Sequence, residues 1–396
     1  MDFFNGFTAG FRKLNLHFLN KITMATRREF ITKTTLASAA LATTHWSAGL
    51  AAVPGNGTRT VFKQQKTENM RYEFPTKAGL GGVAAGNGFS ENTNAQITAT
   101  MQAAWDNGVR YFDTSPWYGL GLSERRMGHF LFEKKREEFV LSTKIGRILE
   151  PDAGFTPNPD LLWKGRLNFR HKYDYSADGV RRSVEDSLQR MGLSSIDVVF
   201  VHDLSPDNGD LGKNWTEQFK IAEKGAFPEL TRMREEGIIK AWGMGVNTPE
   251  PILKCLEVAD PDVMLVAIQY SLVEHKNALE QVFPAMDRKK VTAVIGGPLN
   301  AGFLANRERF NYGGKMPGDM VAKRNKFNAI IKNYNVDLRT VALKFCASHP
   351  TVGAVIPGAS TAEQAAANTR SFSVEIPSGL WAELQAAKLI EANTPV

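Results

Sequence analysis

The sequence contains very little cysteine, and this scarcity excludes two kinds of stabilised scaffold. Among its 396 residues there are two cysteines, Cys255 and Cys346. Two thiols cannot build a disulfide framework or a zinc site with four cysteine ligands. Both cysteines lie in apolar stretches with a helical pattern, so we expect buried free thiols.

Long runs of charge are also absent, as are low-complexity tracts. Hydrophobic residues make up 43% of the chain and charged residues 22%, as in an ordinary globular protein. The formal net charge is +7, of which residues 1–52 contribute +4. The remainder has no basic stripe of the kind that a nucleic-acid backbone requires, so no nucleic-acid partner is expected.

The N-terminal region resembles a targeting segment. Residues 26–33 read TRREFITK, and a mildly apolar run of small residues follows. An arginine pair, Arg27 and Arg28, ahead of such a run resembles a twin-arginine export signal. The run is short and is interrupted by His45 and Trp46, so no membrane integration is expected.

We therefore expect residues 1–53 to be a leader for the twin-arginine translocase, with the periplasm as destination and the cytoplasm as the alternative. Met24 directly precedes the motif and is an alternative start to Met1. Residues 54–74 are expected to form a linker, and residues 75–396 a single domain.

The body of the chain alternates short apolar runs with longer amphipathic ones. The runs lack strict alternation, which suits parallel strands that are buried on both faces. Strands are predicted at 77–82, 109–114, 139–146, 197–203, 241–247, 263–271, 292–298 and 352–359. Helices are predicted at 94–107, 122–135, 178–191, 217–236, 249–258, 276–288, 318–333, 337–348 and 361–369.

Eight strand–helix units predict an α/β fold, a (β/α)8 TIM barrel. A doubly wound open sheet is the alternative. That fold would place a G-x-G-x-x-G turn between a first strand and a helix. The glycines of GLGGVAAGNG, at residues 79–88, are not followed at once by a helix, which favours the barrel.

Polar side chains stand at successive strand exits, where barrel enzymes build their sites. Asp113, Lys144 and His202 end three of the predicted strands, and Tyr118 follows Asp113 by five residues. A lysine ammonium lowers the pKa of a nearby tyrosine, and a carboxylate keeps the lysine protonated. An imidazole can orient or relay a proton. The set predicts proton transfer at a carbonyl or alcohol oxygen, without a metal and with a hydride-carrying cofactor.

The motifs that carry these residues resemble those of the aldo-keto reductase family, in that family's order. They are GVRYFDTSPWYGLGLSERRMG, LSTKIG, IDVVFVHD, WGMGVN and VIPGASTAEQAAAN, and the resemblance runs from about residue 76 to residue 390. It implies an NAD(P)-dependent oxidoreductase of small molecules. Tyr118 would be the general acid and base, tuned by Lys144 and Asp113, and His202 would orient the reacting oxygen.

The resemblance also implies cofactor contacts. Asn247 and Gln269 would hold the nicotinamide carboxamide, and Tyr270 would stack on the nicotinamide ring. Further cofactor residues are expected at Pro298, Leu299, Gly302, Gly358, Ser360, Gln364 and Asn368.

The adenosine end of the site favours NAD over NADP. Gly358 and Gln364 stand where many reductases of the family carry a Lys and an Arg for the 2′-phosphate, and neither is cationic. NADP stays possible because Arg370 or Ser360 could contact that phosphate.

A narrower resemblance concerns the branch with D-threo-aldose 1-dehydrogenase, L-fucose or galactose dehydrogenase, and pyridoxal 4-dehydrogenase. YDYSADGVRRSVEDSLQRMGLSSIDVVFVHDL and VIGGPLNAGFLA carry it. It implies oxidation of a sugar hemiacetal to a lactone. Two alternatives stay open, a general NADPH-dependent aldehyde or ketone reductase and a non-catalytic nucleotide-binding barrel.

Aromatic residues near the predicted site are candidates for contact with a sugar. Trp117, Trp163 and Tyr175 are expected to bind the substrate. The long segments 147–175 and 204–216 are expected to form a lid. The sequence does not distinguish a monomer from a dimer.

Overall fold

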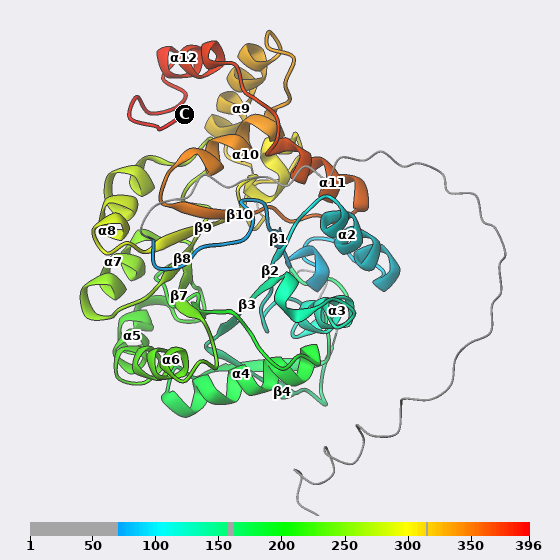
Figure 1. Cartoon of the computed structure of the whole chain (residues 1–396), viewed down its shortest axis with the longest axis vertical. Helices are drawn as coiled ribbons and strands as arrows, with labels where there is room; N and C mark the ends of the chain where they lie inside the picture. The colour runs from blue at the N-terminus through cyan, green and yellow to red at the C-terminus, as the bar shows by residue number, and fades with distance from the viewer. Residues whose placement is uncertain (1–69, 157–161, 314–315) are drawn as a thin grey trace, which may run out of the picture. The chain divides into compact units, whose positions relative to one another are not determined.

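Eight parallel strands close into a barrel in the part of the chain that the structure describes, which is residues 70–156, 162–313 and 316–396 of a computed structural model (Figure 1). Neighbouring strands pair in chain order, and bridges from Ala78 to Val355 and from Gly81 to Gly358 join the last strand to the first. This confirms the predicted fold. The strands are β1 (Leu80–Gly81), β2 (Tyr111–Asp113), β3 (Val140–Ile145), β6 (Val198–His202), β7 (Ala241–Val246), β8 (Val263–Ala267), β9 (Thr292–Gly296) and β10 (Val352–Ile356).

Helices surround the barrel (Figure 1). They are α2 (Asn94–Asp106), α3 (Leu122–Leu131), α4 (Ala177–Met191), α5 (Trp215–Lys224), α6 (Ala226–Glu235), α7 (Pro249–Val258), α8 (Phe283–Arg288), α9 (Gly318–Ile331), α10 (Leu338–Ser348), α11 (Ala362–Ser371) and α12 (Ser378–Ala386). The last of these was not expected from the sequence.

Two predicted helices are interrupted, and a proline lies near each interruption. The expected helix at 217–236 breaks at Gly225, because Pro228 cannot donate a hydrogen bond within a continuous helix. The expected helix at 276–288 begins with a π-turn, η4 (Ala278–Val282), before Pro284 in α8. A π-turn is one way in which a helix accommodates such a residue.

Alternation along each strand separates two hydrophobic clusters. One fills the barrel interior and includes Tyr111, Val198 and Phe200. The other lies between strands and helices and includes Phe112 and Val199. Continuing the inward series to the carboxyl ends of the strands gives Asp113, Lys144 and His202, so the same alternation that builds the core carries polar groups into the barrel mouth.

The barrel floor contains residues that the sequence analysis assigned to the linker. Phe74 is buried, its ring lies 4.5 Å from that of Tyr111, and Tyr72 packs against it. Arg71 also donates a backbone hydrogen bond to Lys290. Residues 71–74 therefore belong to the barrel, whereas the predicted leader, residues 1–53, lies outside the described residues.

An antiparallel hairpin replaces part of the predicted lid. Strands β4 (Arg147–Pro151) and β5 (Phe169–Tyr173) pair along their length.

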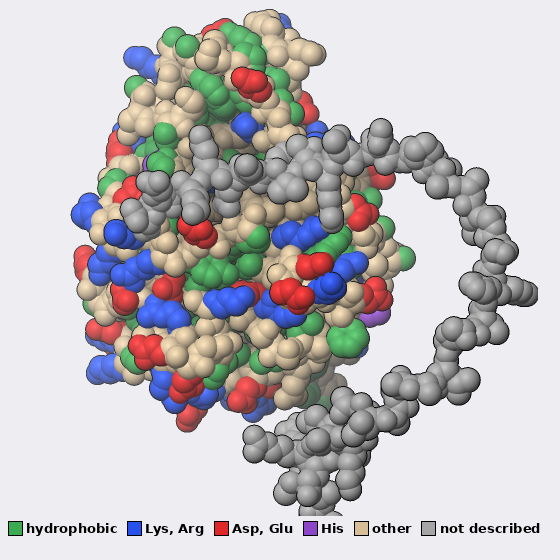
Figure 2. All heavy atoms as spheres, in the orientation of Figure 1, with side chains coloured by type: hydrophobic (Ala, Val, Ile, Leu, Met, Phe, Trp, Pro, Cys, Tyr) green, Lys and Arg blue, Asp and Glu red, His purple; other side chains and the backbone are tan. Residues whose placement is uncertain are grey.

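On the face shown in Figure 2, basic and acidic side chains are interspersed rather than gathered into a stripe. Among the described helices, none has the length and apolar character needed to cross a membrane.

Candidate active site

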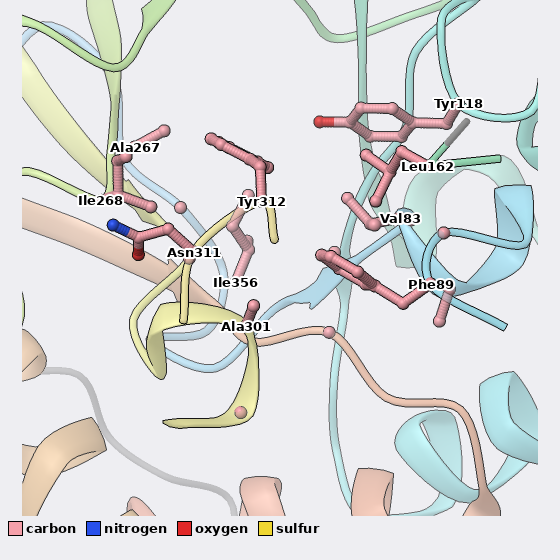
Figure 3. Close-up of a pocket in the computed structure, with 18 of the residues that line it drawn as sticks. Val83, Phe89, Tyr118, Leu162, Ala267, Ile268, Ala301, Asn311, Tyr312 and Ile356 are labelled. Carbon is pink, nitrogen blue, oxygen red and sulfur yellow. The ribbon is translucent and has the colours of Figure 1, made fainter. Parts of the chain in front are cut away.

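A cavity of about 1120 Å³ opens at the carboxyl ends of the barrel strands. Figure 3 shows Tyr118 reaching into it from one side, with Tyr312 on the opposite side and Phe89 and Ile356 below. Asp113, Lys144 and His202 also line it, so the four candidate catalytic residues share one cavity. Its volume exceeds the range of about 300–1,000 Å³ that is typical of small-ligand sites.

Lys144 is fully engaged with Asp113 and the backbone. Its Nζ donates to Asp113 Oδ1 at 3.0 Å, to Asp113 Oδ2 at 2.8 Å and to Thr114 O at 2.8 Å. These three bonds use all three hydrogens of the ammonium group. Ser142 donates to Asp113 Oδ1 at 2.7 Å. Burial raises the pKa of the Asp113 carboxyl and lowers that of Lys144, while the attraction between them opposes both shifts.

Tyr118 stands at the start of an unusual turn. Gly119, Leu120 and Gly121 all have positive φ, at 66°, 51° and 94°. Gly119 and Gly86 approach so closely that a Cβ on Gly119 would lie 2.4 Å from Gly86 O. The turn holds the half-buried Tyr118 ring over Lys144, whose Nζ lies 4.5 Å from the ring centroid.

The sequence analysis expected a lowered pKa for Tyr118, and the structure contradicts this direction. Burial raises the pKa of Tyr118 well above that of an exposed tyrosine, and the carboxylates of Asp113 and Asp203 raise it further. Lys144 does not offset this, because its charge is paired with Asp113 and its hydrogens are all used. The resting side chain is therefore a phenol.

His202 is a buried neutral imidazole. Its ring lies 5.9 Å from the Tyr118 ring, and Ser115 Oγ lies 3.1 Å from its Nδ1. Burial lowers the pKa of His202 well below its usual value, and the cations Arg147 and Lys144 add to this effect.

Sequence reasoning missed two charged residues next to His202. Arg147 is 4% exposed, and its NH1 lies 3.3 Å from His202 Nδ1 and 2.9 Å from Asp203 Oδ2. Asp203 has a φ of 47°, which brings its carboxylate back toward the cavity. Arg147 follows Lys144 by three residues, and Asp203 follows His202 directly. Both are polar residues close to a strand end, and this position could have identified them as site residues from the sequence.

Most predicted cofactor residues line the cavity. They are Asn247, Pro298, Leu299, Gly302, Gly358, Ser360, Gln364 and Asn368. Asn247 already has two partners, since its Nδ2 donates to Asp207 Oδ2 at 2.8 Å and its Oδ1 accepts from Tyr312 OH at 2.9 Å. Their individual roles stay predictions.

Tyr270 was wrongly assigned to the nicotinamide ring. Its side chain is fully buried in the hydrophobic cluster between strands and helices, 5.1 Å from the Phe345 ring. Gln269 is also turned away from the main cavity, because it donates to Val246 O at 3.0 Å and lines a smaller adjacent cavity. Ala267 and Ile268 contribute the cavity wall at this strand end instead (Figure 3).

Two of the three predicted substrate residues reach the cavity. Trp117 and Trp163 line it, and their rings lie 5.8 Å apart. Tyr175 does not, which contradicts the prediction. Its ring packs against Gly146 in the core, and its hydroxyl donates to His202 O at 3.1 Å.

The residues at the other end of the cavity fit a dinucleotide. Gly358 is exposed, and a Cβ there would meet nothing nearer than Gly81 O at 3.9 Å, so its backbone faces open space. Helix α11 begins beside the cavity, and a helix N-terminus favours anionic groups. Arg307, Arg309 and Arg339 line the same cavity. Within the described residues, no group of three His, Cys, Asp or Glu side chains is placed to hold a metal.

The chain belongs to the Aldo/keto reductase family, which matches residues 77–388. It is therefore an oxidoreductase of that family.

Two curated relatives are similar over most of their length. The D-threo-aldose 1-dehydrogenase of a Pseudomonas species is 37% identical over 79% of this chain and 94% of its own. The pyridoxal 4-dehydrogenase of Microbacterium luteolum is 35% identical over 80% of this chain and 94% of its own.

Solved structures share the fold. An aldo-keto reductase of Bacillus halodurans in its holo form covers 80% of this chain and 93% of its own, with 21% identity and a TM-score of 0.61. An aldo/keto reductase of Klebsiella pneumoniae in complex with NADP and acetate covers the same shares, with 18% identity and a TM-score of 0.57.

Proposed function

We propose that this protein is an NAD-dependent aldose 1-dehydrogenase that oxidises a sugar hemiacetal hydroxyl to a lactone. The observation that carries the proposal is the meeting of Tyr118, Lys144, Asp113 and His202 in one cavity, in a chain 37% identical to a D-threo-aldose 1-dehydrogenase. A non-catalytic nucleotide-binding barrel would have no need of a buried phenol beside a lysine–carboxylate pair.

Proton transfer is the task of Tyr118. A bound oxidised nicotinamide would accept the hydride from C1, which is the hydrogen together with the electron pair of the breaking C1–H bond. Tyr118, as phenolate, takes the proton of the C1 hydroxyl, and a C1=O double bond forms. His202 donates a hydrogen bond to the same oxygen and orients it. Trp117 and Trp163 offer apolar faces to the sugar ring.

The preference for NAD is supported by how two of the three arginines at this end of the cavity, Arg309 and Arg339, are engaged. The Arg339 guanidinium pairs with Asp337 at 2.9 Å. Arg309 donates to Ala301 O at 2.8 Å, and its guanidinium lies 3.9 Å from the centroid of the Phe89 ring. Gln364, at the expected 2′ position, is uncharged and accepts from Ser360 N at 2.9 Å. A 2′-hydroxyl suits this neutral amide better than a phosphate dianion does.

The substitution Tyr118→Phe tests the proposal. We expect turnover of L-fucose, galactose and related aldoses with NAD to fall by at least about 1,000-fold, since only the proton-transfer group is lost. Nucleotide binding, measured by quenching of tryptophan fluorescence, should stay near that of the unaltered protein.

Retention of most activity by the Tyr118→Phe variant would overturn the assignment. An unaltered protein that ignores every sugar but consumes NADPH with simple aldehydes would instead be a general carbonyl reductase. Pyridoxal belongs in the same substrate panel, because the second relative acts on it.

We further propose that residues 1–53 direct the protein to the periplasm. The support is the Arg27–Arg28 pair and the small-residue run that follows it. The twin-arginine route would allow the barrel to fold and bind its cofactor before export.

A further inference from the structure

The environment of the His202 ring is asymmetric. Beside Nδ1 stands Arg147, whose guanidinium carries only donors and has no acceptor. Beside Nε2 stands Asp203, whose Oδ1 lies 3.5 Å away and, as a carboxylate, can only accept. One nitrogen is thus offered a donor and the other an acceptor.

Ser115 reinforces the same polarity. Its Oγ accepts from the backbone N of Trp117 at 3.1 Å, so its own hydrogen is available for Nδ1, which lies 3.1 Å away. Both neighbours of Nδ1 can therefore donate to it. A neutral imidazole with Nδ1 as acceptor must carry its single hydrogen on Nε2.

Two aromatic rings and the Asp203 carboxylate hold the Arg147 guanidinium beside His202 Nδ1. Its guanidinium carbon lies 4.7 Å from the Trp117 ring centroid and 4.9 Å from that of Tyr173, so the cation stands between two aromatic faces. Asp203 Oδ2 fixes one nitrogen of the fork at 2.9 Å. Gly146, with a φ of 111°, turns the chain from β3 into the β4 hairpin that presents Arg147.

We propose that Arg147 is a positioning residue that fixes His202 as the Nε2–H tautomer, so that the one hydrogen of the ring stands on Nε2. The 3.5 Å from Nε2 to Asp203 Oδ1 is too long for a good hydrogen bond, so this hydrogen is available to the reacting oxygen. This inference rests on the proposed function for the role of His202 toward substrate. With the hydrogen on Nδ1 instead, Nε2 would present a lone pair to the oxygen that His202 has to bind.

The groups that face His202 determine what removing Arg147 would do. Arg147 and Lys144 are the cations, Asp203 is the adjacent carboxylate, and Tyr118 is a phenol. Loss of Arg147 removes the cationic one of the two donors at Nδ1, leaving Ser115, and it also leaves Asp203 without its arginine partner. Both changes favour a proton on each nitrogen of the ring. The substitution Arg147→Lys keeps a cation and a donor, so it should restore much of the function.

The test compares the unaltered protein with Arg147→Met and Arg147→Lys. Long-range ¹H–¹⁵N spectra of histidine side chains report the tautomer, and a His202→Gln variant identifies the His202 signals. We expect the Nε2–H form in the unaltered protein. In Arg147→Met we expect a mixture of tautomers or a doubly protonated ring. Arg147→Lys should return the spectrum toward the Nε2–H form.

Kinetics give a second readout. Arg147→Met should lower kcat by about 10- to 100-fold and move the acid limb of the pH profile upward, with unchanged nucleotide affinity. Arg147→Lys should recover at least about tenfold of a 100-fold loss. An Arg147→Met/Asp203→Asn variant, which removes both charges, serves where Arg147→Met does not fold.

An unchanged tautomer in Arg147→Met, or an Arg147→Lys variant as impaired as Arg147→Met, would overturn the inference and leave Arg147 a structural support of the hairpin. The spectra require no substrate. If the unaltered protein oxidises no sugar, the proposed function fails, while the tautomer result still decides the role of Arg147.

Discussion

Lys144 and Asp113 are each costly to bury alone, and the structure buries them together. Their side chains are 1% and 2% exposed and make an ion pair at 2.8 Å. Removing one partner from such a pair typically costs more than the pair contributes, because the other charge stays buried without compensation. The two residues therefore form a unit in which stability and chemistry are coupled.

This coupling makes a prediction for Lys144→Met. We expect a loss of about 3–5 kcal/mol in the free energy of unfolding, because the Asp113 carboxylate is left unpaired. An Asp113→Asn/Lys144→Met variant should regain much of that stability without regaining turnover. Denaturant unfolding and initial rates measure both. A double variant no more stable than the single one would contradict the prediction.

The raised pKa of Tyr118 predicts how the rate depends on pH. Oxidation needs the phenolate, and the resting group is a phenol, so the fraction of competent protein grows as pH rises. We expect the oxidation rate to increase across about pH 6 to 9, without a plateau near neutrality. Reduction, which needs the phenol, should not fall over the same range. Initial rates in both directions test this, and an oxidation rate that levels off by pH 7 would argue against it.

Strand ends made the catalytic residues predictable from sequence. Asp113, Lys144 and His202 continue the inward-facing series of their strands, so a strand assignment already directs them into the barrel mouth. Tyr175 lies outside the predicted strands, and Tyr270 lies in the predicted strand 263–271 but beyond the observed end of β8 at Ala267. Both residues pack in the core. The position of Arg147 beside His202 depends on the β4–β5 hairpin, and the sequence analysis had interpreted this segment as a loop.

At the scale of elements, the tight turn after Tyr118 is the part of the site that tolerates least change. Gly119 needs a left-handed backbone, and it also leaves no room for a Cβ against Gly86. Gly192, at the end of α4, has a similar φ of 65° and nothing within 4 Å of its Cβ position. A side chain at either position would strain the backbone, but only one at Gly119 would also clash with a neighbouring residue.

Because the two glycines have nearly the same φ, comparing Gly119→Ala with Gly192→Ala isolates the effect of the clash. Gly192→Ala should cost about 1–2 kcal/mol in the free energy of unfolding through its backbone alone, with kcat unchanged. Gly119→Ala should cost more, and kcat should fall by at least about tenfold, because the clash moves Tyr118. Equal effects of the two substitutions on kcat would show that the close approach of Gly86 does not position the tyrosine.

Helix boundaries show what sequence patterns leave out. The amphipathic pattern predicted one helix at 217–236, and the structure breaks it at Gly225, just ahead of Pro228. The proline is a local signal of the break, whereas the close approach of Gly225 to Tyr175 and Ser176 joins segments distant in the chain, which a local pattern does not contain. The helix α7, which depends on its own sequence and a proline at its start, was predicted with its observed bounds.

At the scale of the whole molecule, the proposed export signal and the proposed catalytic site lie in different parts of the sequence. Residues 71–74, which were predicted to end the linker, belong to the described barrel. The arginine pair of the proposed export signal, Arg27 and Arg28, lies outside the described residues.

Replacing Arg27 and Arg28 together by Lys tests the export proposal. In a bacterial host with the twin-arginine translocase, we expect the altered protein to stay in the cytoplasm and the unaltered protein to reach the periplasm. Cell fractionation measures the distribution. An Arg12→Lys variant is the control and should be exported normally. An equal distribution of the double variant and the unaltered protein would count against the proposal.

Asn247 bears on ligand exchange. Its amide is already bonded to Asp207 on one side and to Tyr312 on the other. A ligand amide that reaches Asn247 therefore trades hydrogen bonds rather than adding them, and the net gain in affinity is small. The same trade has to be reversed before the ligand leaves. Binding at Asn247 thus breaks its hydrogen bonds to Asp207 and Tyr312, and release of the ligand lets them form again.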